Sequence, residues 1–172
     1  GIFNFRAEDV FTNHLPQKIL VAFVRSTAFN GTYLSNPLFF NPSEAIEHVE
    51  FLKNGVRLGL QQTMPINLTA AGTDKHIAYR ELNKAVNGSR NNIGLPFSLA
   101  SFRQGYFFAA LDLTPDGQDD LAHRYPTEQG SISIHVKLRE ALPHGIEMLP
   151  YGVFQERSDI NKSRAVVSSV NV

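Results

Sequence analysis

The chain has 172 residues, 42% of them hydrophobic and 19% charged, which suits one folded domain with a sizeable core and argues against disorder. Its 16 basic and 16 acidic residues cancel and are scattered, so it lacks the basic excess with which proteins bind nucleic acid. There is no cysteine, which excludes disulfides, thiolate zinc sites and a cysteine nucleophile, and no apolar run approaches the length of a membrane span.

Strand and loop patterns dominate the start of the chain. Ile2–Phe5 alternates briefly and is interpreted as a short opening segment. Lys18–Arg25 is a continuous apolar run with charged ends, rich in β-branched and aromatic residues, and predicts a buried strand. Phe29–Asn41 is rich in Asn, Gly and Pro, which predict a loop.

A hairpin and a helix are predicted next. His48–Lys53 alternates and meets Asn54-Gly55, a strong signal for a two-residue turn, so Val56–Leu60 is expected to return beside it. Helix is expected mainly over Asp74–Val86, where Thr73 or Asp74 could provide the cap. Its apolar stripe is weak and consists of Ile77, Leu82 and Val86.

The most distinctive segment is Gly105–Gly117. Tyr106–Leu113 is apolar on both faces, which predicts a strand buried between two layers. Thr114–Gly117 combines Pro, Asp and Gly in the manner of a tight turn. The segment contains no nucleophile–base pair, metal-ligand spacing or phosphate loop, so it indicates packing rather than chemistry.

The last third of the chain is again strand. Gly130–Arg139 alternates cleanly, with Ile and Val on one face and Ser, His, Lys and Arg on the other. Ile146–Gln155 and Arg164–Val170 are two further predicted strands. The predicted core consists of ten apolar residues from three strands: Ile19, Val21, Phe23, Phe107, Ala109, Leu111, Ile132, Ile134, Val136 and Leu138.

These elements predict one all-β domain over residues 1–172. The expected fold is an antiparallel jelly-roll sandwich of about eight strands with one short helix in a loop. Alternating strands and helices, internal repeats and linkers are not found in the sequence.

Six histidines raise the question of a metal centre. None forms His-x-His or His-Glu-x-x-His, and His48 and His135 could meet only if their strands pair and both side chains face inward. His135 falls on the polar face of its strand. We therefore expect no transition-metal site and no required cofactor.

An acidic cluster and scattered carboxylates are the other chemical candidates. Asp112, Asp116, Asp119 and Asp120 could offer oxygens to calcium, although such a run is usually a solvated turn. No Gly-x-Ser-x-Gly elbow, dinucleotide-binding loop or phosphate loop is present. We expect no catalytic residues and no enzymatic activity.

Long loops with their own apolar residues usually fold back or bind a partner. Three such loops are Phe29–Asn41, Asn87–Phe97 and Pro115–Thr127. We predict that they make protein–protein contacts at the ends of the sandwich. The candidate interface residues are Tyr33, Phe39, Phe40, Ile93, Leu95 and Tyr125.

Several segments together resemble a known family in their order and spacing, over nearly the whole chain. They are Leu15-Pro16 with Ile19–Val24, Ala28–Tyr33, Asn36–Phe40, Lys53–Gly55, Gly105–Phe108 with Asp112–Asp116, and Gly130–Leu138 with Ala141–Pro143. The sequence is similar to the C-terminal jelly-roll region of the double jelly-roll major capsid proteins of Maverick/Polinton elements and adintovirus-like viruses. The Asp-Leu-Thr-Pro-Asp motif is the most specific part of the likeness.

The resemblance implies a structural protein of a viral shell. Its partners would be other capsid protein chains, with a homotrimer in the full-length context, and it would bind neither nucleic acid nor membrane directly. It would be made inside the host cell, not secreted, and would reside in the virion. The family carries a further jelly roll before this region, and no catalytic residues are implied.

Two other classes of function stay open. A lectin-like or host-domesticated jelly roll could recognise a glycan or protein partner through loop aromatics. A cupin-type enzyme is disfavoured by the arrangement of the histidines.

Overall fold

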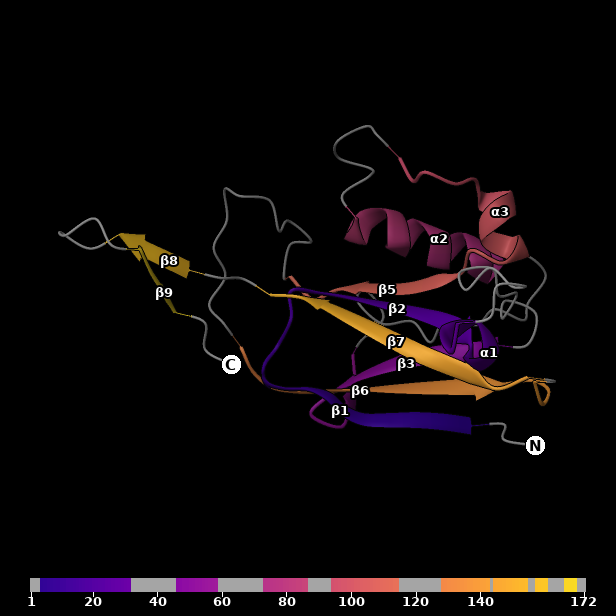
Figure 1. Cartoon of the computed structure of the whole chain (residues 1–172), viewed down its shortest axis with the longest axis horizontal. Helices are drawn as coiled ribbons and strands as arrows, with labels where there is room; N and C mark the ends of the chain where they lie inside the picture. Colours follow the sequence, from indigo (N-terminus) through magenta and orange to yellow (C-terminus); the bar gives the residue numbers. More distant parts are fainter. Residues whose placement is uncertain are drawn as a thin grey trace.

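The computed structural model describes residues 4–31, 46–58, 73–86, 94–114, 128–142, 144–154, 157–160 and 166–169. In these residues the chain forms two antiparallel sheets packed face to face, with helices over one of them (Figure 1). The expected all-β sandwich is therefore confirmed.

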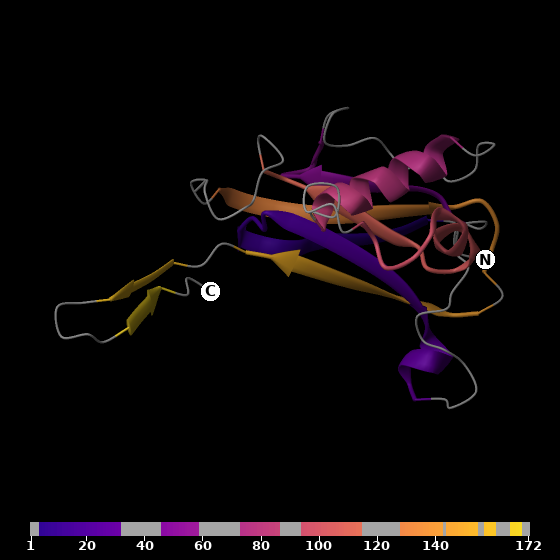
Figure 2. The same cartoon turned by 90° about the horizontal axis from the view of Figure 1, so that it is seen from above.

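The first sheet has the strand order β1-β6-β3-β4, with β1 (Asn4–His14), β6 (Gln129–Leu138), β3 (Ile46–Lys53) and β4 (Val56–Arg57). The second sheet has the order β5-β2-β7, with β5 (Phe108–Asp112), β2 (Lys18–Arg25) and β7 (Ile146–Val153). A separate hairpin pairs β8 (Arg157–Ile160) with β9 (Val166–Ser169) and stands away from the sandwich (Figures 1 and 2).

The strand pairs are nested along the chain in the manner of a jelly roll. β1 pairs with β6, β2 with β5, and β3 with β4. The chain crosses between the two sheets from β1 to β2 to β3, and again from β5 to β6 to β7. An eight-stranded roll has four nested pairs. At the place of the fourth pair, between β4 and β5, the described chain has two helices, while β7 is added beside β2.

The helices are α1 (Ser26–Phe29), α2 (Thr73–Ala85) and α3 (Leu99–Gln104). The helix predicted over Asp74–Val86 is confirmed as α2, but the expectation of only one helix is wrong. In α3, the Ser98 side chain accepts a hydrogen bond from the Ser101 N–H at 3.2 Å, and Gly105 ends the helix with φ 149°. Both α1 and α3 span fewer than two turns, too short for a periodic pattern to show.

The buried face of α2 also differs from the expected stripe. Ala78, Leu82 and Ala85 are the buried residues, whereas Val86 is 42% exposed. The small alanines let α2 lie close over β5 (Figure 1). Val86 lies beyond the last helical residue, and there it faces solvent.

All ten predicted core residues are buried, none more than 6% exposed. Three consecutive residues of β5, Ala109, Ala110 and Leu111, are buried because one face of the strand meets the opposite sheet and the other meets α2. The prediction of a strand between two layers is thus confirmed.

The opening strand is longer than predicted. β1 runs over 11 residues rather than the short Ile2–Phe5 segment. Its register against β6 shifts between Ala7 and Phe11, and Asp9 in that bulge has φ 50° with its N–H donating to the Ser133 Oγ at 3.1 Å. A bulge inserts residues that put the side-chain alternation out of step, so the sequence pattern was interrupted.

The β3–β4 turn gives a first stability prediction. Asn54 and Gly55 have φ 51° and 75°, as a primed hairpin turn requires, and the Asn54 Oδ1 accepts from the Ser131 N–H at 2.8 Å. We expect Asn54→Ala to lower the free energy of unfolding by about 1 kcal/mol in urea titrations. The control is Asn30→Ala, in an exposed turn. Equal effects of the two changes would show that the bond to β6 contributes nothing.

Candidate functional site

Ion pairs run across the outer face of the β1-β6-β3-β4 sheet. Glu50 of β3 is only 8% exposed and is contacted by the Arg57 guanidinium at 2.9 Å and the His48 Nε2 at 3.2 Å. On the other side of β6, the His135 Nε2 lies 3.0 Å from the Glu8 Oε1. This face is therefore a set of short-range pairs with balanced charge rather than a patch of one sign.

The two histidines singled out in the sequence do lie on paired strands. Glu50 is the cross-strand partner of His135, and Lys137 is the partner of His48, so both histidines share one face. That face points away from the core, and each imidazole is held by a different carboxylate. Within the described ranges, no group of three or more His, Asp or Glu side chains is arranged to hold a metal ion.

Two carboxylates on this face give a prediction for acid stability. The hydrogen bonds from the Ser133 hydroxyl and, second, from His135 lower the pKa of Glu8 from its ordinary 4.5. For Glu47, the hydrogen bond from Lys137, 2.9 Å from Nζ to Oε1, lowers the pKa in the same way. A pKa lowered by folding stabilises the protein above the unfolded value, and this contribution is lost as pH falls through the folded value.

We therefore expect unfolding to become easier below about pH 4.5, with a shallower dependence in the double variant Glu8→Gln/Glu47→Gln. Urea midpoints measured between neutral and acidic pH would test this. Glu140→Gln, at an exposed position, is the matched control. If the double variant and the control follow the same pH profile, the two pairs do not contribute.

Asp112 is engaged locally. Its Oδ1 accepts from the Thr114 N–H at 2.9 Å and from the Thr114 hydroxyl at 2.6 Å, which closes the turn after β5. Asp116, Asp119 and Asp120, the other members of the acidic cluster, lie outside the described residues. The described part of the cluster thus has a structural role as a turn.

Of the six candidate interface residues, Leu95 is described. It is partly buried and packs against the core cluster. Tyr33, Phe39, Phe40, Ile93 and Tyr125 lie outside the described residues, so their interface role stays a prediction.

An exposed apolar face was missed by the sequence analysis. On the outer side of the β5-β2-β7 sheet, Tyr151 is 65% exposed and Leu149 is 37% exposed. Their cross-strand partners on β2 are Leu20 and Ala22, which are half-buried. Leu149 and Tyr151 lie two positions apart in the predicted strand Ile146–Gln155, so they could have indicated this face. The alternation of a strand does not by itself say which side of the sheet other elements cover.

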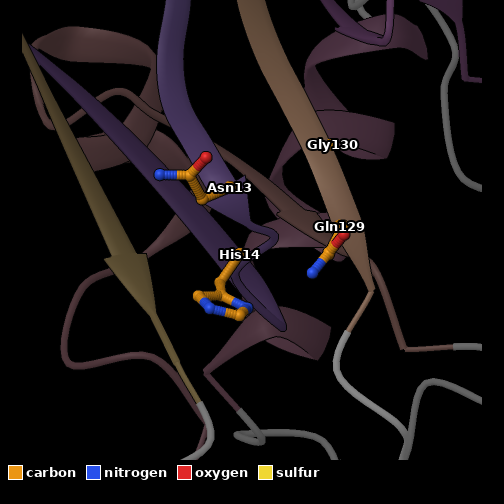
Figure 3. A pocket seen from close by; sticks show the side chains of 4 residues that line it. All are labelled: Asn13, His14, Gln129 and Gly130. Atoms are coloured by element: carbon orange, nitrogen blue, oxygen red, sulfur yellow. The ribbon is translucent and has the colours of Figure 1, made fainter. Parts of the chain in front are cut away.

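A small polar pocket opens at one end of the β1–β6 ladder. It has a volume of about 440 Å³ and is lined by Asn13, His14, Gln129 and Gly130 (Figure 3). Asn13 has φ 70°, and the buried His14 Nδ1 has no hydrogen-bond partner among the described residues. Amides and an imidazole can exchange hydrogen bonds with a neutral polar ligand. No motif in the sequence indicated this pocket.

No protein-family model and no solved structure matches the chain. The chain is similar to the uncharacterized protein F54H12.2 of Caenorhabditis elegans, with 24% identity over 160 residues. The alignment covers 91% of this chain and 37% of the nematode protein, so the chain spans less than half the length of the curated relative it matches. Among the described helices, none is long and apolar enough to cross a membrane.

Proposed function

We propose that the chain is a jelly-roll building block of a capsid protein, which assembles through protein–protein contacts into a viral or virus-like shell. The observation that carries the proposal is the nested pairing of β1 with β6, β2 with β5 and β3 with β4, the wiring of a jelly roll. The resemblance of the sequence to Maverick/Polinton capsid proteins supports the same assignment.

The surface is suited to assembly. Charges on the outer face of the first sheet are paired, whereas Leu149 and Tyr151 on the second sheet are open to a neighbour. Exposed apolar and aromatic side chains are the usual anchors of protein interfaces. The proposed partners are other capsid protein chains, as a homotrimer in the full-length context, and the proposed location is the virion. This role requires neither catalysis nor a cofactor.

The length of the nematode relative bears on how the shell would form. Because the alignment covers 37% of that protein, a second roll of similar size fits within the remainder. We therefore propose that trimers and shells need the full-length protein, and that the 172-residue chain alone is monomeric or weakly associated.

The test is to express the full-length protein and examine it by mass photometry and negative-stain electron microscopy. We expect trimers and closed particles. A full-length protein that stays monomeric at high concentration, with a cooperative unfolding transition showing that it is folded, would contradict the proposal. Phe39→Ser/Phe40→Ser in that protein tests the loop residues separately, since assembly should fail if they form the interface.

A second candidate function is favoured by the polar pocket. A lectin-like module would bind a glycan through Asn13, His14 and Gln129, without needing assembly. Titration with monosaccharides and glycan fragments, followed by NMR, would detect it. Binding that is abolished by His14→Ala but retained in Thr12→Ala, an exposed neighbour on the same strand, would favour the lectin over the capsid.

A further inference from the structure

The outer face of the β5-β2-β7 sheet is covered unequally. α2 packs mainly on β5 and less on β2, so this helix leaves the β7 side uncovered (Figure 1). Leu149 and Tyr151 stand on this open side, opposite Ala22 and Leu20 of β2. We call these four residues the β7 face. Tyrosine is among the residues most enriched at interface hot spots, the few positions that contribute most of the binding energy. Because the Tyr151 side chain is 65% exposed, it is available to a partner.

The hairpin that follows β7 has no major contact with any other described strand or helix. β8 and β9 pair from Arg157 with Ser169 to Ile160 with Val166, and among the described elements they pack mainly on each other. Both views show this arm projecting from the end of the sandwich (Figures 1 and 2). A two-stranded hairpin alone is marginally stable in water, so the arm needs a surface to lie on.

The base of the arm is anchored where β7 ends. The Phe154 ring packs edge-on against Phe11, with ring centroids 5.8 Å apart and planes at 70°. Gly152 makes room for this pair, because a Cβ there would lie 2.8 Å from the Phe11 ring and 3.0 Å from that of Phe154. This contact holds the end of β7 against β1, and both views show the β8–β9 arm standing away from the sandwich (Figures 1 and 2).

We infer that the β8–β9 arm of one copy lies on the β7 face of a second copy. Every copy carries one arm and one face, so exchange between copies covers both. Pro150 in the middle of β7 has no amide N–H to offer a new strand, which favours docking on the face over pairing at the edge. This inference rests on the proposed self-association and adds which surface meets which.

The 172-residue chain contains no cysteine, so a cross-linking test is clean once any cysteine elsewhere in the full-length protein is replaced by serine. Tyr151→Cys and Ser168→Cys are made in separate full-length chains with different tags, mixed, and oxidised mildly. Because Tyr151 is largely exposed, its replacement should not disturb folding. We expect a disulfide-linked heterodimer on non-reducing gels, at several times the yield of the control pair Thr12→Cys with Ser168→Cys. Thr12 is an exposed residue of the other sheet.

Three outcomes separate the possibilities. Heterodimer above the control supports arm exchange. A double variant Tyr151→Cys/Ser168→Cys that closes within one chain at high dilution, while the mixed single variants give only control yields, would show that the arm folds back and would overturn the inference. Shells that assemble normally with no cross-link above control would also overturn it while leaving the capsid proposal intact. Cross-linked dimers without trimers or shells would support arm exchange and contradict the capsid proposal.

Discussion

Replacing Phe102 with Ala is expected to lower the free energy of unfolding by about 3–5 kcal/mol. Phe102 is 1% exposed and joins the helices to the second sheet. Its ring centroid lies 5.4 Å from that of Tyr79 on α2 and 5.3 Å from that of Phe107 beside β5. Truncation would leave a cavity between α2, α3 and the sheet, which the surrounding rings cannot fill by small movements.

Urea denaturation followed by circular dichroism would measure this loss. The matched control is Phe29→Ala, because Phe29 is 58% exposed and should cost little. Similar losses for the two variants would mean that the aromatic cluster does not hold the helices in place. In that case α2 and α3 would not take over the packing role of the fourth strand pair of a jelly roll.

The second large effect is expected for Ile134→Ala, at about 2–5 kcal/mol. Ile134 is fully buried at the centre of β6 and pairs with both neighbours, Ala7 of β1 and Phe51 of β3. Removing its side chain therefore opens the middle of the first sheet toward the core. The control Val56→Ala removes a valine side chain that is 67% exposed and should stay close to neutral. An Ile134 variant as stable as that control would show that this face of β6 is not core.

The strands with an uninterrupted pattern could be predicted from the sequence. β2 has the bounds that its charged ends suggested, Lys18–Arg25, and the apolar run between those ends predicted a strand. β6 was found by its alternation, and the Asn54-Gly55 turn by its need for positive φ. In each case one local rule and the tertiary structure agree.

The remaining elements depend on contacts that a local pattern does not contain. The bulge at Asp9 is set by pairing with Ser133, which lies 124 residues away, so alternation along β1 fails there. β8 is four residues long and was missed, although its partner β9 lies within the predicted Arg164–Val170. α3 depends on a single serine cap and on the aromatic residues that it buries.

The candidate sites divide in the same way. That His135 lies on a polar face followed from the alternation of β6, but its pairing with Glu8 required the β1–β6 register. The pocket at Asn13 and His14 is formed by the end of one ladder, and the β7 face exists because α2 covers only part of its sheet. Which part of a sheet stays open is decided by the packing of other elements.

The nesting of the strand pairs also determines how long β1 stays unpaired during synthesis on the ribosome. β1 leaves the ribosome well before β6, because contacts such as that of Asp9 with Ser133 span 124 residues. At about 5–20 residues per second, β1 waits roughly 6–25 s for its partner to be made. During that interval the nascent strand is open to pairing with other nascent chains. Its charged residues Arg6, Glu8 and Asp9 discourage such pairing, so part of the sequence of β1 serves the chain before it has folded.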